Sequence, residues 1–387
     1  MCKDTNYLLF SMLRSLFCNK ELADREKALV TEETIEQVIR LASKHDIAHL
    51  IALSILNNGL SNDKNKSKLQ EYALRAFHRY AIQNNEFIQI CEVLEKEQIP
   101  FIPLKGSVLR NHYPEPWWRT SCDIDVLVEE HNLQKAISCL IENLEYTEQK
   151  HNSHDVTLSS KSGICLELHF YLGEEGRANF AVDTLKDVWN YSQPKDGCKF
   201  CLEMSDDMFY YYHIAHMAEH FETGGCGIRP FVDLWILDNM ESVDVGKRNR
   251  LLKAGNLLKF ANKVRKLSRI WFGGDSHDDV TLKLENYIIS GGVYGSIENN
   301  VKVQQIKQGS KFRFIMSKIF LPTRYIEQTY PSVKKRKWLI PFMQIRRWIT
   351  IAVRGISPRT KNELKSNREI SSTQAEQMRN FLDEVGL

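Results

Sequence analysis

The sequence predicts an α+β protein in which a small mixed β-sheet is flanked by N-terminal and C-terminal helical regions. Residues 5–95 carry apolar side chains at helical spacing. Residues 99–172 alternate short apolar runs with amphipathic segments, and helical spacing returns from residue 205. We therefore expect a helical region at 1–95, a sheet domain at 96–204, a second helical domain at 205–350, and a polar tail at 351–387 with a terminal helix. Within this tail, the polar residues 357–371 are expected to be irregular.

The composition is that of an ordinary globular protein, with 43% hydrophobic and 26% charged residues. The net charge of +3 gives no reason to expect a nucleic-acid partner. Nine scattered cysteines, a start unlike a signal peptide and no apolar run near about 18 residues predict a cytoplasmic protein without a transmembrane segment. The single Cys198-x-x-Cys201 pair lacks the four ligands of structural zinc, so we expect two strand cysteines.

The N-terminal helices lead into the sheet. Thr31 is a candidate N-cap for a helix that begins with two glutamates. A long helix over residues 69–96 ends directly before the first strand, so we expect it to pack against the sheet. Arg75 and Arg79 lie one turn apart on this helix, where they either face solvent or contact phosphate.

The central stretch, residues 101–128, has the pattern of strand, tight turn, short helix, loop and strand. Residues 101–104 are apolar, and Gly106 allows a sharp turn directly after them. Helical spacing over residues 108–113 ends at two prolines. Residues 123–128 are then the second strand.

Two carboxylates, Asp123 and Asp125, point to one side of this second strand, because side chains alternate between faces. Their repulsion destabilises the chain unless a cation relieves it, and Mg²⁺ binds hard oxygen ligands together with substrate phosphates. A third acid, Glu167, lies in an expected strand over residues 164–170. If the two strands are neighbours, the acids converge on a two-metal site for an in-line displacement.

His169 follows in the same strand as Glu167. We assign it to a different face from Glu167, where it either contacts substrate or is a structural histidine. An amphipathic helix over residues 130–144 and strands at 147–149 and 156–158 complete this region.

Three histidines, His213, His216 and His220, lie on one face of a helix that begins near residue 206. A zinc site there would lack a fourth ligand, so we expect none. The glycine-rich residues 224–227 are expected to be a loop, with a phosphate cradle as the alternative.

The C-terminal region contains two further features. Asp233 is expected to pair with Arg229 in the same helix. Residues 311–348 combine many basic residues with interleaved aromatic ones. This segment can bind nucleic acid or an anionic membrane face, and the alternative is a helical module with solvated lysines.

The order of these pieces resembles the DNA polymerase beta-like nucleotidyltransferase superfamily. A glycine-serine turn opens a helix, an Asp-x-Asp strand follows, and a distant strand carries the third carboxylate. The sequence resembles still more closely an uncharacterised bacterial nucleotidyltransferase family, over about residues 30–350. The gap from Ser107 to Asp123, which contains the loop at 114–122, is longer than expected for the superfamily. The matching pieces are Leu104-Lys105-Gly106, Tyr113-Pro114, Arg119, Asp123-Ile124-Asp125, Glu167-Leu168-His169, His216-x-x-x-His220, residues 229–233, Tyr330-Pro331 and Ile340-Pro341.

The resemblance implies a nucleotidyltransferase palm that holds Mg²⁺ or Mn²⁺ through Asp123, Asp125 and Glu167. Glu167 would also act on the acceptor hydroxyl. The nucleoside triphosphate, with ATP as the expected donor, would lie against a second set of residues. These nucleotide-binding residues are Lys105, Gly106, Ser107 and Arg119, and those expected near the substrate are His169, His216, His220 and Arg229.

Two roles remain open for the cations in this set. Lys105 and Arg119 either meet the negative charge of the leaving pyrophosphate or are structural. In the second case Lys105 ends a strand, and Arg119 pairs with Glu115 at the surface.

The expected reaction moves a nucleoside monophosphate from the triphosphate to an acceptor hydroxyl or phosphate and releases pyrophosphate. The acceptor is an unidentified small molecule, peptide or protein, and nucleic acid is not the expected partner. The alternatives are an inactive nucleotide-binding or regulatory protein of the same fold, and a template-independent RNA-end nucleotidyltransferase.

Overall fold

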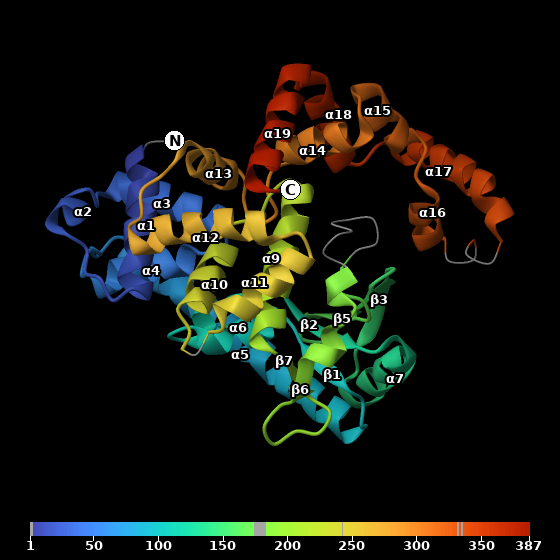
Figure 1. The fold of residues 1–387 in the computed structure, drawn as a ribbon, viewed down its shortest axis with the longest axis horizontal. Helices are drawn as coiled ribbons and strands as arrows, with labels where there is room; N and C mark the ends of the chain where they lie inside the picture. The colour runs from blue at the N-terminus through green and yellow to red at the C-terminus, as the bar shows by residue number, and fades with distance from the viewer. Residues whose placement is uncertain (1–2, 174–182, 242, 331–332, 334–335) are drawn as a thin grey trace.

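A five-stranded mixed sheet lies in the middle of the chain in a computed structural model, which describes residues 3–387 except 174–182, 242, 331–332 and 334–335 (Figure 1). The side chains of residues 3, 324, 328 and 329 are also left undescribed. The strand order is β1-β2-β5-β4-β3. Because β2 and β5 run parallel while their neighbours run antiparallel, the predicted mixed sheet is confirmed. The strands are β1 Phe101–Pro103, β2 Asp123–Val128, β3 Thr147–His151, β4 Asp155–Ser159 and β5 Cys165–His169.

The two faces of the sheet have different environments. Except for Leu127, the aliphatic residues of β2, β4 and β5 point to one face and share a core with α5 (Lys66–Lys96) and α7 (Leu133–Leu144). The predicted packing of the long helix against the sheet is therefore confirmed. The opposite face carries Asp125 and Glu167. Leu127 lies on this second face and belongs to a different core.

Helices from both sides of the sheet in the sequence form that second, larger core. Thr31 caps α3 as predicted, since its hydroxyl accepts a hydrogen bond of 3.2 Å from the Thr34 amide. Because helices from both regions share this core, the two helical regions pack as one body over the polar face of the sheet. The main contributing helices are α1 Lys3–Phe17, α3 Glu32–Lys44, α4 Ala48–Asn57, α9 Asp206–Glu222, α10 Arg229–Asp238 and α12 Leu258–Gly273.

The C-terminal region is helical almost to its end. The predicted irregular segment at 357–371 is wrong, because Ser357 caps a helix whose Glu363 and Asn367 are buried. The predicted terminal helix is confirmed. The remaining helices are α2 Asp24–Ala28, α6 Gly106–Leu109, α11 Val245–Ala254, α13 Asp279–Ser290, α14 Ile297–Gln308, α15 Lys311–Ile319, α16 Thr323–Thr329, α17 Ile340–Arg354, α18 Pro358–Glu369 and α19 Ser372–Val385.

We call residues 311–356, which contain α15, α16 and α17, the C-terminal arm. The arm extends away from the sheet and the main helical core (Figure 1). Of the basic residues noted in its sequence, Lys334 and Lys335 lie outside the described residues. No helix in the described parts of the chain is long and apolar enough to cross a membrane.

The Cys198-x-x-Cys201 pair lies in a small hairpin of β6 (Ser192–Pro194) and β7 (Leu202–Met204). Cys198 is in the turn between the strands, where its amide donates to Lys195, so the predicted strand position is wrong for this cysteine. The reason is that the chain reverses there. Cys201 forms an isolated bridge with Phe101.

Residues 224–227 form the predicted loop, and this loop packs against a second glycine-containing loop at 291–295. Gly224 has φ +118° and Gly295 has φ +71°, in a region that favours glycine. A Cβ atom on Gly295 would lie 2.0 Å from the carbonyl oxygen of Gly224. The backbones of the two loops are therefore so close that only glycine fits at position 295.

Gly295→Ala should lower the free energy of unfolding by about 2–4 kcal/mol, since a left-handed φ costs about 1 kcal/mol and overpacking costs about 1–3 kcal/mol. Urea unfolding followed by circular dichroism measures the loss. Gly59→Ala is the matched control, because Gly59 also has a positive φ of +65° but has open space around it. Its expected loss is about 1 kcal/mol. Equal losses in the two variants would show that the close approach relaxes without cost.

Candidate active site

The Asp-x-Asp strand and the Glu167 strand are neighbours. β2 and β5 pair in parallel, with Asp125 directly opposite Glu167 and Asp123 opposite Cys165. Asp125 is buried, at 3% exposure, whereas the side chain of Glu167 is 30% exposed. Two carboxylates therefore face one cavity from adjacent strands, one at depth and one nearer to solvent.

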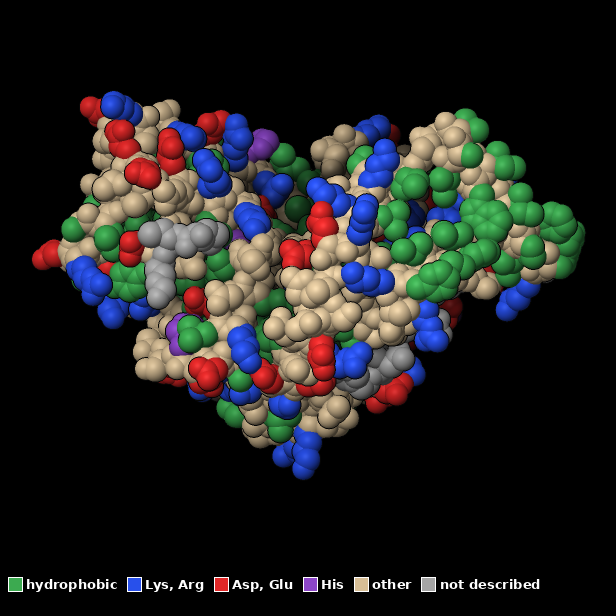
Figure 2. Space-filling view, turned by 90° about the horizontal axis from the view of Figure 1, so that it is seen from above, with side chains coloured by type: hydrophobic (Ala, Val, Ile, Leu, Met, Phe, Trp, Pro, Cys, Tyr) green, Lys and Arg blue, Asp and Glu red, His purple; other side chains and the backbone are tan. Residues whose placement is uncertain are grey.

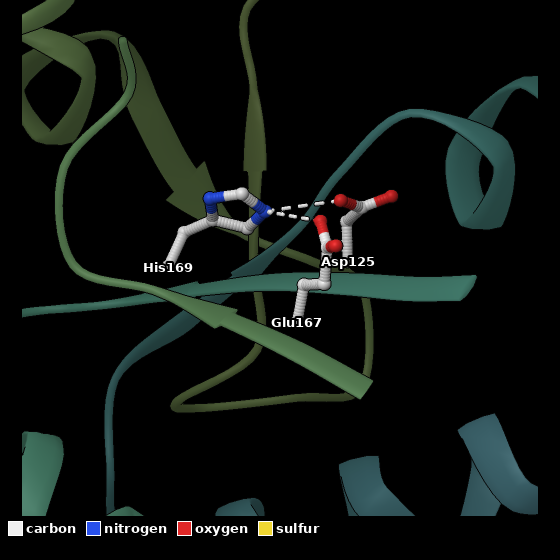
Figure 3. A group of neighbouring side chains, drawn as sticks. All are labelled: Asp125, Glu167 and His169. Carbon is white, nitrogen blue, oxygen red and sulfur yellow. Dashed lines mark hydrogen bonds and ion pairs between the residues drawn. The ribbon is translucent and has the colours of Figure 1, made fainter. Parts of the chain in front are cut away.

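His169 belongs to the same group, and its assignment to a different face from Glu167 is wrong. Residues two apart along a strand share a face, so β5 presents both side chains on one side. His169 Nε2 lies 3.0 Å from Asp125 Oδ1 and 3.6 Å from Glu167 Oε2 (Figure 3). Burial alone would lower the pKa of His169, but the hydrogen bonds to Asp125 and Glu167 raise it to about 9. The imidazole is therefore positively charged at neutral pH.

Lys105 supplies a second positive charge to Asp125. Its Nζ lies 2.7 Å from Asp125 Oδ1, the same oxygen that His169 contacts. Burial alone would lower the pKa of Lys105, but the charge of Asp125 raises it well above its ordinary value. The Lys105 backbone has φ 42°, a strained region for a side chain other than glycine. This strained residue joins β1 to α6 and holds the ammonium group over the acids.

The acids differ in how well their charges are compensated. Burial would raise the pKa of Asp125, but Lys105 and His169 hold it well below its ordinary value. Among the residues that the structure describes, no cation forms an ion pair with Asp123. Burial and the charge of Asp125 raise the pKa of Asp123 to about 6. Asp123 is therefore the carboxylate that would gain most from an added cation.

The turn after β1 brings Gly106 to the cavity and leaves Ser107 behind it. A Cβ atom on Gly106 would lie 3.2 Å from the Cβ of Ser121, so glycine permits close packing there. The amide of Ser107 donates to the carbonyl oxygen of Leu104 at 3.2 Å and is engaged within the turn. The Ser107 hydroxyl is buried and has no hydrogen-bond partner among the described residues. Gly106 lines the cavity, and Ser107 does not.

Arg110 holds this turn in place, and our sequence analysis missed it. Its Nε donates to the Gly106 carbonyl oxygen at 2.9 Å, and its Nη2 donates to Ser121 Oγ at 3.2 Å. The guanidinium is buried, and burial together with the charge of Arg119 lowers its pKa to about 10. The available signal was its spacing of four residues from Gly106 in a short helix, which places it beside the turn.

Arg119 is held in a buried ion pair with Asp233. Its Nε and Nη2 donate to the two carboxylate oxygens at 2.7 and 2.9 Å, and its Nη1 donates to the Thr120 carbonyl oxygen at 2.8 Å. The Tyr113 hydroxyl also donates to Asp233, at 2.6 Å. The alternative surface pairing of Arg119 with Glu115 is wrong, because the side chain turns inward. The ion pair joins the loop before β2 to α10.

Arg229 has a different partner from the predicted one. Its Nη1 donates to Asp46 Oδ2 and to the Thr120 carbonyl oxygen, both at 2.9 Å. The predicted pairing with Asp233 is wrong, because Arg119 occupies that carboxylate. Arg229 thus ties α10 to the N-terminal helices and to the same loop before β2.

A cavity of about 300 Å³ contains most of the predicted site. His216 and His220 reach it from α9 with their rings 4.4 Å apart and perpendicular. Burial lowers the pKa of His216 well below its ordinary value, so this ring is neutral. Nine predicted site residues line the cavity: Lys105, Gly106, Arg119, Asp123, Asp125, Glu167, His216, His220 and Arg229.

Other lining residues were not predicted. Tyr212, four residues before His216 on α9, is buried beside Lys105 in the cavity wall, and its helical spacing was the available signal. His45 and Tyr294 line the cavity from distant segments that carry no local signal. His213 is also in the wall, where its Nε2 lies 3.0 Å from the Pro230 carbonyl oxygen.

The comparison with known proteins agrees with this geometry. A family model described as an uncharacterised nucleotidyltransferase matches residues 31–273. The chain belongs to this family. The match spans every predicted site residue of the nucleotidyltransferase and ends before its C-terminal arm. The resemblance that we expected at Tyr330-Pro331 and Ile340-Pro341 lies beyond the residues that match the family model. Pro331 is also outside the described residues. No curated protein matches the chain.

The nucleotidyltransferase has side chains that fit a divalent metal. Asp125, Glu167 and His169 each offer one ligand atom, and these atoms lie within 4.8 Å of one another. His169 would have to release its proton to bind the metal, because only a neutral imidazole is a ligand. Carboxylate oxygens suit Mg²⁺ and Mn²⁺, and an imidazole nitrogen also suits several transition metals. Asp123 is not in this close group, although it lines the same cavity.

Removing either partner of the Arg119–Asp233 pair should destabilise the protein by about 3–5 kcal/mol, because the other charge is left buried and unpaired. Arg119→Met and Asp233→Leu together should cost less than the sum of the single changes. A double-mutant cycle of urea unfolding measures the coupling. Additive losses would show that the pair does not act as a unit.

The pair also predicts a pH dependence. Burial would raise the pKa of Asp233, but Arg119 holds it below its ordinary value. The stabilisation is therefore complete above about pH 4, the unfolded value, and is lost as the pH falls through the lower folded value. The stability difference between the wild type and Asp233→Asn should be constant at neutral pH and shrink in acid. A difference that grows in acid would contradict this assignment.

Proposed function

We propose that the protein transfers a nucleoside monophosphate from a nucleoside triphosphate to an acceptor hydroxyl or phosphate and releases pyrophosphate. The observation that carries the proposal is the pairing of Asp125 with Glu167 across parallel strands, with Asp123 on the same face of β2. Lys105 and Gly106 line the same cavity and offer a cation and a close-packed turn. The site thus combines acids for a metal with a cation for phosphates.

In this proposal Asp123, Asp125 and Glu167 hold Mg²⁺ or Mn²⁺, with His169 beside them. The metal would supply charge stabilisation to the attacking and leaving oxygens. The acceptor oxygen attacks the α-phosphorus, and the bond to the bridging oxygen of pyrophosphate breaks. Glu167, the most exposed of the paired acids, takes the acceptor proton. Lys105 meets the negative charge that develops on pyrophosphate.

The remaining assignments follow from position in the cavity. Gly106 would approach the phosphates, with Ser107 supporting the turn and Arg119 beside it. His216, His220 and Arg229 would contact the acceptor, which we expect to be a small molecule, peptide or protein. ATP is the proposed donor, and a reducing cytoplasm is the proposed location.

Asp123→Asn should abolish transfer while raising the thermal stability of the metal-free protein. The ionised Asp123 is half-buried beside Asp125, and no ion pair offsets its charge among the described residues, so removing that charge relieves repulsion. Turnover should fall by at least about 100-fold, and the melting temperature in chelator should rise by about 2 °C or more. The assay follows pyrophosphate release from ATP, with Mg²⁺ or Mn²⁺, over a panel of acceptors. Asp187→Asn, an exposed acid, is the control.

Near-normal turnover by Asp123→Asn would overturn the metal assignment. Nucleotide binding by the wild-type protein without turnover on any acceptor would favour the inactive binding protein. Extension of RNA ends in preference to small acceptors would favour the RNA-end transferase.

Lys105→Ala should weaken triphosphate binding by at least about tenfold and leave nucleoside binding nearly unchanged, because Lys105 is proposed to contact the phosphates. Isothermal titration with ATP and with adenosine measures the two affinities. Lys150→Ala, in the exposed strand β3, is the control. If the variant keeps the wild-type preference for triphosphate over nucleoside, Lys105 serves only as the counter-ion of Asp125.

A further inference from the structure

The C-terminal arm concentrates the positive charge of the protein. Residues 311–356 contain eleven lysines and arginines and a single acidic residue, Glu327. Since the whole chain carries +3 and this segment carries +10, the rest of the chain carries −7. The arm is therefore a basic segment on an otherwise acidic protein. It also lies outside the residues that match the nucleotidyltransferase family.

The arm also exposes hydrophobic surface. Of the large hydrophobic side chains that are exposed among the described residues, half lie in these 46 residues. Figure 2 shows hydrophobic side chains gathered over the end of the molecule that the arm forms. Single exposed apolar residues need no explanation, but a contiguous patch indicates an interaction surface.

Helix α17 is turned with its apolar side outward. Its polar inner side holds it to the end of α15, because the Gln344 amide donates to the Leu321 carbonyl oxygen at 2.7 Å. Arg347 Nη1 and Trp348 Nε1 both donate to the Ile319 carbonyl oxygen, at 3.0 and 2.8 Å. These three residues lie on one helix face.

The opposite face of α17 is an apolar stripe that continues from the preceding turn. Its members recur every three or four residues and are 49–79% exposed. Exposed cations stand next to members of the stripe in the sequence, at Lys337, Arg346 and Arg354. The stripe consists of Trp338, Phe342, Ile345, Ile349 and Val353.

We propose that the C-terminal arm docks the protein on an anionic phospholipid bilayer. The α17 stripe would enter the boundary between headgroups and acyl chains, and the flanking cations would contact lipid phosphates. α17 has 15 residues and a polar inner face, so it lies on the membrane surface and does not span it. The proposal does not depend on nucleotidyl transfer.

The chemistry of the stripe favours lipid over nucleic acid. Proteins that bind single-stranded DNA or RNA use aromatic side chains, because every base has a π face on which an aromatic ring can stack. Ile345, Ile349 and Val353 are aliphatic and offer no such stacking. An arm-to-arm contact with a second copy of the chain is disfavoured by charge, since the two basic arms would repel each other. An anionic bilayer is complementary to both the charge and the apolar stripe.

Co-sedimentation of the full-length protein with phospholipid vesicles tests the proposal. The protein should bind vesicles that contain phosphatidylglycerol at least about tenfold more tightly than vesicles of phosphatidylcholine alone, and high salt should weaken this binding. Ile349→Glu should lower the partition coefficient by at least about tenfold. Arg346→Gln should lower it on the anionic vesicles only. Leu282→Glu, at an exposed position of α13, is the matched control and should bind as the wild type does.

Several results would overturn the proposal. These are equal binding to both kinds of vesicle, no binding to either, or wild-type binding by Ile349→Glu. Analytical ultracentrifugation of the lipid-free protein gives a further check. A dimer that Ile349→Glu converts to a monomer would assign the stripe to a second copy of the chain. Binding of single-stranded RNA that displaces vesicles and is lost in Ile349→Glu would assign it to nucleic acid.

Discussion

The parallel pairing of β2 with β5 is the constraint on which the rest of the site depends. It places Asp125 directly beside Glu167 and brings His169 to the same face. Two acids so close, one of them buried, require nearby positive charge. Lys105 provides that charge from the end of β1, at the cost of a strained backbone. The turn after β1 and the strands β2 and β5 therefore form one electrostatic unit.

A second set of buried charges connects this unit to the helices. Arg119, in the loop before β2, forms an ion pair with Asp233 of α10. Arg229, in α10, forms an ion pair with Asp46 of the N-terminal helical region. Arg119 also donates to the Thr120 carbonyl oxygen, and Arg229 donates to the same atom. The loop before β2 is thus clamped from two sides. A change in the packing of α10 would therefore shift the position of Asp123, which lies three residues after Thr120 in the chain.

Much of the fold followed from local patterns in the sequence. Alternation on β2 placed Asp123 and Asp125 on one face. The position of α5 directly before the first strand predicted its packing against the sheet, and apolar spacing predicted α7. Contacts between residues far apart in the sequence could not be predicted from such local patterns. Arg119 finds Asp233 across 114 positions because both enter one interior space, and no local pattern reports this. His169 is a different case, since the two-residue period of a strand already required it to share a face with Glu167. Helix α18 was missed because most of its residues are polar and exposed, so no apolar spacing indicates a helix. Its buried residues, Glu363 and Asn367, are themselves polar, and its cap is a single residue, Ser357.

The core shared by helices that precede and follow the sheet in the sequence has a practical consequence for dissecting the protein. α1, α3 and α4 bury their apolar faces against α9, α10 and α12, and Leu127 of the sheet joins them. A fragment cut at residue 96 would open this interior to water along its whole length. The sheet region therefore cannot be excised, transplanted or shortened from its N-terminal side as an independent module. Any search for a minimal catalytic unit has to begin from the complete helical body and trim inward from the arm.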